Sequence, residues 1–394
     1  MKEESFRYNQ RGVSASKDEV HRAIEFLDKG IFPNAFCKVL PDIVGSDEAY
    51  CNIMHADTAG TKTSLAYIYW KETGDLDVWK GIVEDAIVMN TDDMACIGCV
   101  NNIVLSSTIG RNKHLIPGEV IQTIIRHSQD FIEKMEKFGI NIHLAGGETA
   151  DVGDIVRTLD VGYTTFCRML QKDVVDIQIK PGDYIVGFSS SGRATYEDTY
   201  NGGMGSNGLT SAKHDLFHKK YREIYPESFT ENMDVNYAYT GSYSLTDSVD
   251  IPGSRTTMGK LVLSPTRTYM PVIQQILKEH KNHINGMIHC SGGGQTKVLK
   301  FLNNQSLVIK DNLFDVPLLF QLIQKESKAN VKEMYQVFNM GHRLEIYTPS
   351  LQSAEEMIDI SNQYNIEAKV IGRVVSSDSP GVMIKTEHSE TFYA

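Results

Sequence analysis

The residues of this chain whose types and spacing suit chemistry on phosphate are a few acids and one lysine. Asp57 ends a short apolar run that begins at Cys51, and Lys62 follows in the next turn. An acid and a lysine held this close can serve a metal ion and a phosphate group together. The alternative is an exposed salt bridge. The turn is not a P-loop, because Thr61 separates Gly60 from Lys62 and breaks the required pattern.

A second acid, Glu148, follows a pair of glycines. The apolar run over residues 140–145 predicts a strand, and Gly146 and Gly147 predict a tight turn that stops it. Glu148 would then lie on a loop held by a rigid strand, a common place for binding and catalytic groups. The alternative is an ordinary turn with a solvated acid.

Three more acids share a predicted helix over residues 79–97. Asp85, Asp92 and Asp93 are spaced so that they fall along one stripe of that helix and can face the same cleft. They lie among Ile, Val, Met and Ala, where an acid is costly unless it has a partner.

The elements that must position these residues follow from periodicity and breakers. Helices are predicted at residues 18–27 with Ser16 as N-cap, 117–138 with Gly139 at the C-terminal end, 265–279, 295–302 and 352–364. Strands are predicted at residues 51–57, 159–169, 184–189, 287–290 and 337–347, the last broken at Gly341. The expected domains are 1–179 and 180–394, with a polar, tyrosine-rich insertion around 193–257.

Two glycine-rich turns are candidate anion sites. The stretch Gly203-Met-Gly205-Ser206-Asn207-Gly208 matches G-x-G-x-x-G, but it lacks the preceding strand and the later acid of a dinucleotide fingerprint. A helix starting at Leu209 would still point free N–H groups at an anion. Gly292, Gly293 and Gly294 repeat the strand–glycine–helix design.

Composition excludes several classes of protein. A formal net charge of −11 over 394 residues disfavours a nucleic-acid-binding surface. No apolar run has the length of a membrane span, and the first twenty residues contain no apolar signal core, so a cytoplasmic protein is expected. The six cysteines show no disulfide framework. Cys96 and Cys99 form a C-x-x-C pair, which we interpret as buried small side chains rather than a metal or redox site.

Taken in order, these motifs resemble those of the phosphoribosylformylglycinamidine cyclo-ligases, also called aminoimidazole ribonucleotide (AIR) synthetases. The matching stretches in the first half are His55-Ala-Asp57-Thr-Ala-Gly-Thr-Lys62, Glu84-Asp85-Ala-Ile-Val-Met89, Asp92-Asp93 and Gly146-Gly-Glu-Thr-Ala150. Those in the second half are Lys180-Pro-Gly-Asp183, Ser190-Ser-Gly192, Gly205-Ser-Asn-Gly208, Ser264-Pro-Thr-Arg267-Thr-Tyr269, Ser291-Gly-Gly-Gly294, Glu333-Met-Tyr335, Phe338-Asn-Met-Gly341 and Ile371-Gly372.

The resemblance implies an α+β fold of two domains, with an N-terminal sheet domain at a homodimer interface and a C-terminal α/β domain. It implies ATP-dependent ring closure of formylglycinamidine ribonucleotide to AIR through phosphorylation of the amide oxygen, and a small-molecule substrate rather than nucleic acid or membrane. The implied catalytic residues are Lys62 and Asp57; the implied Mg²⁺ ligands are Asp57, Asp85, Asp93 and Glu148. ATP would contact Thr61, Lys62, Asp85, Asp93, Gly146, Gly147, Glu148 and Thr149, and the substrate Ser190, Gly205, Ser206, Asn207, Gly208, Gly292, Gly293 and Gly294.

The chain departs from the family pattern at two informative positions. Gly205 stands where the family usually has a histidine before Ser-Asn-Gly, and Arg343 stands where it has the second glycine of F-N-x-G-x-G-M. His55, His214 and His289 are candidates to replace the missing histidine.

Two alternatives stay open: a related enzyme that phosphorylates another small substrate, as in selenophosphate or thiamine-phosphate synthesis, and a catalytically silent nucleotide-binding homologue. Cys37 is the one early cysteine that a selenophosphate synthetase would need.

Overall fold

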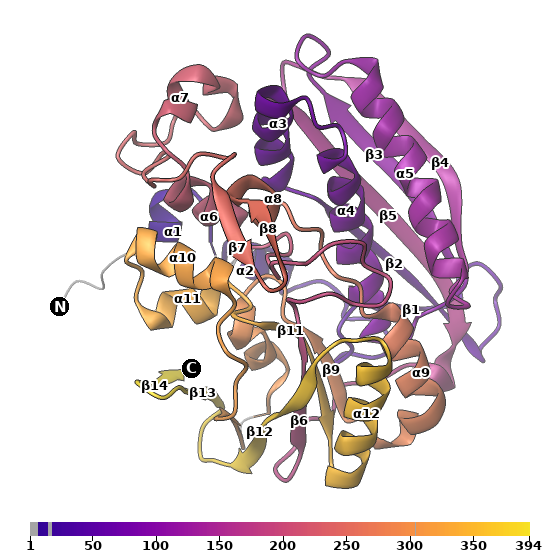
Figure 1. Ribbon diagram of the computed structural model, residues 1–394. Helices are drawn as coiled ribbons and strands as arrows, with labels where there is room; N and C mark the ends of the chain where they lie inside the picture. Colours follow the sequence, from indigo (N-terminus) through magenta and orange to yellow (C-terminus); the bar gives the residue numbers. More distant parts are fainter. Residues whose placement is uncertain (1–6, 15–17, 304) are drawn as a thin grey trace.

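Two β-sheets with helices packed on them form the body of the molecule (Figure 1). The structure is a computed structural model that describes residues 7–14, 18–303 and 305–394. The predicted N-cap Ser16 lies outside these residues, and the helix after it, α2, spans Asp18–Ile24. No helix of the described ranges is long and apolar enough to cross a membrane.

The first sheet has five strands in the order β1-β2-β5-β3-β4. Its strands are β1 (Val39–Pro41), β2 (Tyr50–Thr58), β3 (Ile103–Arg111), β4 (Ile142–Asp151) and β5 (Leu159–Leu170). The helices of this part are α1 (Arg7–Gln10), α3 (Lys62–Thr73), α4 (Val78–Ala95) and α5 (Gly118–Glu136). The amphipathic helix α5 and the largely buried α4 pack on one face of the sheet (Figure 1).

The glycine pair at 146–147 does not end a strand, so the predicted turn is wrong. β4 continues through both glycines to Asp151. Between Leu105 and Ser107 the parallel pairing of β3 with β4 shifts register, because β4 has one extra residue there. Gly147 is required for close approach, because a Cβ there would lie 2.1 Å from Ser107 Oγ, whereas Gly146 has a positive φ of 101°.

The second sheet has seven strands in the order β14-β13-β10-β12-β6-β11-β9. They are β6 (Tyr184–Ser189), β9 (Gly286–His289), β10 (Ser306–Lys310), β11 (His342–Thr348), β12 (Ala368–Ser376), β13 (Gly381–Lys385) and β14 (Glu390–Tyr393). The helices of this part are α6 (Leu209–Leu216), α7 (Lys220–Ile224), α8 (Met258–Val262), α9 (Met270–His280), α10 (Leu318–Ser327), α11 (Val331–Val337) and α12 (Leu351–Gln363).

Three predicted elements of this half need correction. The helix expected at 265 begins at Met270, and residues 265–269 run as an irregular segment past α4. The segment at 294–301 is a 3₁₀ helix rather than an α-helix. The strand expected from Val337 is the end of α11, and β11 begins only after Gly341.

The tyrosine-rich segment contains α7 and a short hairpin of β7 (Ser248–Ile251) and β8 (Ser254–Thr257). It packs against α3 and α6: the Tyr67 hydroxyl donates to Glu227 at 2.6 Å, and Lys213 Nζ donates to the Ser228 carbonyl at 2.7 Å. The segment therefore covers the helices that follow Asp57 and Gly208.

Candidate functional site

A cavity of about 200 Å³ lies where the first turn of α6 meets the loop after β2. It is lined by Tyr8, Val13, Asp57, Thr58, Ala59, Gly60, Thr61, Met89, Ser206, Asn207, Gly208, Leu209 and Thr210. Gly208, with a positive φ of 77°, is the N-cap of α6, whose first backbone N–H groups have no partner within the helix. The Thr61 and Thr210 hydroxyls lie 3.0 Å apart and join the two walls. The wall is therefore rich in donors suited to an anion.

Helix α4 lies behind this cavity and presents its acids to the segment 264–269. Asp85 accepts two hydrogen bonds from Thr266, and Asp92 accepts from the Thr268 hydroxyl at 2.7 Å and the Tyr269 N–H at 2.9 Å. The predicted shared face is confirmed for Asp85 and Asp92, but it is a buried interface rather than an open cleft, and Asp93 instead contacts His55 and His289. Because of this burial, the pKa values of Asp85 and Asp92 are raised.

Lys62 is fully buried, and its ammonium is saturated. Nζ donates to Asp85 Oδ1 at 2.8 Å, the Ser264 carbonyl at 2.5 Å and the Gly205 carbonyl at 3.3 Å. An ammonium has three donors, and these three bonds use all of them. Burial lowers the pKa of Lys62. Lys62 thus holds α3, α4 and the glycine turn together.

Asp93 lies between two histidines. His289 Nδ1 is 2.6 Å from Asp93 Oδ1, and His55 Nε2 is 3.4 Å from Asp93 Oδ2. Although burial opposes it, hydrogen bonding by the two histidines lowers the pKa of Asp93 well below its usual range. The pKa of His55 is raised, because the contact with Asp93 outweighs burial. His214 differs: it is buried against Tyr239 and accepts that residue's N–H, and burial lowers its pKa well below the usual value.

Arg343 on β11 completes this buried group. Its Nε donates to His289 Nε2 at 3.2 Å, and its Nη2 donates to the Arg267 carbonyl. A guanidinium cannot accept a hydrogen bond, so His289 Nε2 is the acceptor and its proton is on Nδ1, toward Asp93. The guanidinium lies beside Gly205: a Cβ at that position would be 3.0 Å from Arg343 Nη1.

Asp57 and Glu148 point to opposite faces of the first sheet. Asp57 pairs with Tyr163, whose hydroxyl contacts Ser128 on α5, so Asp57 is on the helix face. Glu148 pairs with Thr108 in the next row, which faces away from the helices. The four predicted metal ligands are thus not gathered in one protomer, since Asp57 alone lines the cavity.

Of the other residues predicted to contact ATP or the substrate, some line the cavity and others lie away from it. Ser206, Asn207 and Gly208 line the cavity, and Gly292 lies beside Asn207. Ser190 is buried, and its hydroxyl donates to Asn339. Gly293 and Gly294 form the tight start of the 3₁₀ helix, where a Cβ on Gly294 would meet the Tyr335 and Phe338 carbonyls. Gly146, Gly147 and Thr149 are on β4, away from the cavity.

The sequence matches two family models: AIR synthase related protein, N-terminal domain, over residues 37–169, and AIR synthase related protein, C-terminal domain, over residues 180–385. The chain belongs to the AIR synthase related protein family.

Curated members of this family align along most of the chain. One, named phosphoribosylformylglycinamidine cyclo-ligase, from Methanococcus vannielii, is 31% identical over 294 residues, which is 74% of this chain and 70% of the relative. Another of that name, from Alkaliphilus metalliredigens, is 25% identical over 390 residues, covering 95% of this chain and 97% of the relative.

Solved structures share the family fold at low identity. The Thermotoga maritima PurL complexed with FGAR matches with a TM-score of 0.54 and 15% identity, over 96% of this chain and 49% of that one. The HypE-HypF complex matches with a TM-score of 0.53 and 14% identity, over 96% of this chain and 98% of that one. These likenesses support the two-domain α+β fold.

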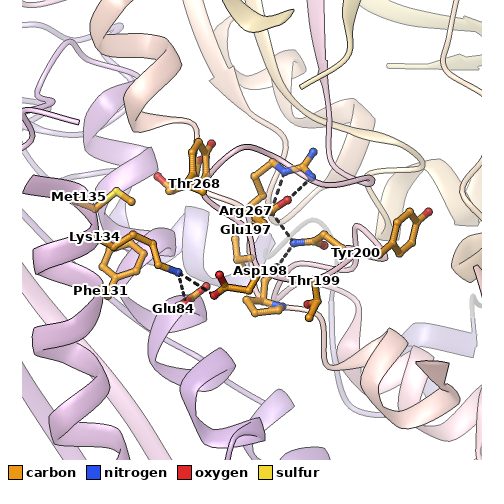
Figure 2. A pocket seen from close by; sticks show the side chains of 14 residues that line it. Glu84, Phe131, Lys134, Met135, Glu197, Asp198, Thr199, Tyr200, Arg267 and Thr268 are labelled. Carbon is orange, nitrogen blue, oxygen red and sulfur yellow. Dashed lines mark hydrogen bonds and ion pairs between the residues drawn. The ribbon is translucent and has the colours of Figure 1, made fainter. Parts of the chain in front are cut away.

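A second cavity, of about 90 Å³, lies between α5 and the segments 196–201 and 265–268 (Figure 2). Its charges are paired with one another: Lys134 lies 3.6 Å from Glu84, and Arg267 makes two bonds to Glu197. Lys134 also lies 3.9 Å from Asp198, an ion pair that joins the two halves of the chain and indicates a structural contact between them.

The cysteines are buried, as predicted for the C-x-x-C pair. Burial raises the pKa of the Cys37 thiol well above its usual value, so this residue is unsuited to nucleophilic chemistry. Sequence reasoning missed Tyr8 and Val13, which line the cavity from the N-terminal segment; no motif marks them. It noted Arg343 only as a departure from the family pattern, and this departure was the one signal in the sequence that could have marked the residue.

Proposed function

We propose that this protein closes the imidazole ring of AIR. The γ-phosphoryl group of ATP passes to the amide oxygen of formylglycinamidine ribonucleotide, and ADP leaves. The amidine nitrogen then attacks the carbon that bears this oxygen and loses a proton. The bond between that carbon and the phosphorylated oxygen breaks, and inorganic phosphate leaves. The observation that carries this proposal is the alignment, at 25–31% identity, with family members named for this reaction.

The cavity contacts fit this chemistry. We propose that the first turn of α6, with Ser206 and Asn207, binds phosphate oxygens, and that Thr61 helps to orient them. The charge that develops on a transferred phosphoryl group needs fixed donors in a site shielded from water. Lys62 holds the glycine turn in place for this role rather than contacting the phosphate, because its three donors are already used.

Mg²⁺, when bound, would offset the negative charge of the phosphate groups. Asp57, which lines the cavity, is the residue we assign to it. Asp85 and Asp93 fit less well, because each is buried and already bonded to a cation or to histidines. Within one protomer, therefore, the residues fit a single carboxylate ligand and not the set of four.

A homodimer would bring Glu148 of one protomer close to the cavity of the other. The face of the first sheet opposite α4 and α5 carries exposed residues, among them Met54 at 63% exposure, Ala56, Ser106 and Thr108. We propose that two protomers pair through this face, so that Glu148 of one protomer lies near the cavity of its partner. We also propose the domain division at 179/180, since the first sheet ends at Leu170 and the second begins at Tyr184.

The test is phosphate release by the purified protein with Mg-ATP, with and without formylglycinamidine ribonucleotide. We expect substrate-dependent release together with the imidazole product, and at least a hundredfold lower rate for Asp57→Asn. Wild-type protein that binds ATP without substrate-dependent turnover would instead support another acceptor or a catalytically silent homologue.

A further inference from the structure

Gly205 lies between two buried cations. Lys62 Nζ is 3.3 Å from its carbonyl oxygen, and Arg343 Nη1 is 3.0 Å from the position of a Cβ. Arg343 is 2% exposed and Lys62 is 0% exposed. The two cations differ in one respect: Lys62 has a carboxylate partner in Asp85, whereas no ion pair of Arg343 with a carboxylate occurs among the described residues.

Arg343 has donors to spare. A guanidinium carries five N–H groups. The contact to His289 uses the one on Nε, and the contact to Arg267 uses one of the two on Nη2. Nη1 is buried and has no hydrogen-bond partner within residues 7–14, 18–303 and 305–394. Burying an unpaired charge is costly, and a buried donor without an acceptor requires an explanation. An anionic ligand supplies both the missing charge and the missing acceptor.

Two further unsatisfied oxygens lie in the same network. The hydroxyl of Ser206, the residue after Gly205, is buried without a partner in the described part of the chain, and so is Asp85 Oδ2. Asp85 reaches Gly205 through Lys62. Ser206 also lines the cavity beside α6. The unused Nη1 therefore lies beside Gly205, the residue that precedes Ser206 of the cavity wall.

We propose that Arg343 is the free cationic donor of this site: Nη1 binds an oxygen of a phosphoryl group that enters at Gly205 and Ser206. This role rests on the proposed function for the identity of the phosphoryl group, and it assigns Arg343 the contact that Lys62 cannot make. The stack of the guanidinium on Tyr269, 5.6 Å from the ring centroid, and the bond to His289 fix its position.

Two measurements on purified full-length protein test this role. The first is the rise in melting temperature caused by inorganic phosphate, and the second is steady-state kinetics of ring closure. The variants are Arg343→Gln and Arg343→Lys, with Arg373→Gln as the matched control, since Arg373 is half-exposed and paired with Asp311. Gly205→Ala keeps the arginine but places a Cβ 3.0 Å from Nη1.

We expect phosphate to raise the melting temperature of the wild type and of Arg373→Gln. Arg343→Gln and Gly205→Ala should need at least tenfold more phosphate for the same rise. In kinetics, kcat of Arg343→Gln should fall about 10²–10³-fold while KM for ATP changes less than about threefold, because the donor acts on charge that develops during transfer. Arg343→Lys should retain part of the rate.

Undiminished phosphate protection and kcat in Arg343→Gln would overturn the proposal. If that variant does not fold, undiminished protection of both Arg343→Lys and Gly205→Ala would overturn it instead. The phosphate measurement needs no ribonucleotide. Arg343-dependent protection without ring closure would therefore count against the proposed function alone.

Discussion

Asp57 and Glu148 occupy adjacent rows of one sheet and point to its opposite faces. Two intervening strands, β5 and β3, separate them, which amounts to about 14 Å at the usual strand spacing. One metal ion cannot bind both residues within a protomer. The pair contributes to one site only if Glu148 comes from a second copy of the chain.

This arrangement predicts complementation between two inactive variants. Asp57→Asn and Glu148→Gln should each be nearly inactive, whereas a mixture dissociated and reassembled together should regain about a quarter of wild-type activity. Half of the dimers are then mixed, and each mixed dimer has one intact site. The measurement is ring-closure rate after mixing, and Asp57→Asn mixed with Asp57→Ala is the control that should recover nothing. Equal inactivity of both mixtures would contradict a shared site.

A second prediction concerns the Lys62–Asp85 pair. Asp85→Asn leaves a fully buried ammonium without its countercharge, so we expect the free energy of unfolding to fall by about 3–5 kcal/mol. Asp57→Asn, at the cavity wall, should change it by less than about 1 kcal/mol. Urea unfolding of the two variants measures the difference. A small effect of Asp85→Asn would mean that Asp85 is available as a metal ligand after all.

A third prediction is a rise of stability with pH caused by Lys213. This lysine is 2% exposed on α6, and burial lowers its pKa to about 7. In the unfolded chain its pKa is about 10.4, so between these values the unfolded state binds more protons and stability increases by up to about 1.4 kcal/mol per pH unit. Urea midpoints from pH 7 to 9.5 measure this slope. Lys213→Met should flatten it, and Lys80→Met should not, because the Lys80 side chain is 44% exposed.

Much of the fold was predictable because local patterns determine it. Strand β6 begins and ends at the predicted residues, and α6 begins at Leu209 as expected after a glycine turn. The row of acids on α4 was also predictable from helical spacing.

What sequence could not show depends on residues far apart in the chain. The face of Glu148 is set by one extra residue in β4 relative to β3, and a shift of one residue reverses every side chain beyond it. The saturation of Lys62 depends on carbonyls 143 and 202 positions away, at Gly205 and Ser264. No local pattern encodes these contacts.

The closeness of Arg343 to Gly205 also couples the two positions at which this chain departs from the family pattern. A Cβ at position 205 would lie 3.0 Å from Arg343 Nη1, which is a tight contact, and the φ of 66° at Gly205 adds strain to any replacement. A side chain at position 205 would therefore require the end of the Arg343 side chain to shift. We therefore expect the two departures from the family pattern to be linked, so that relatives show positions 205 and 343 varying together.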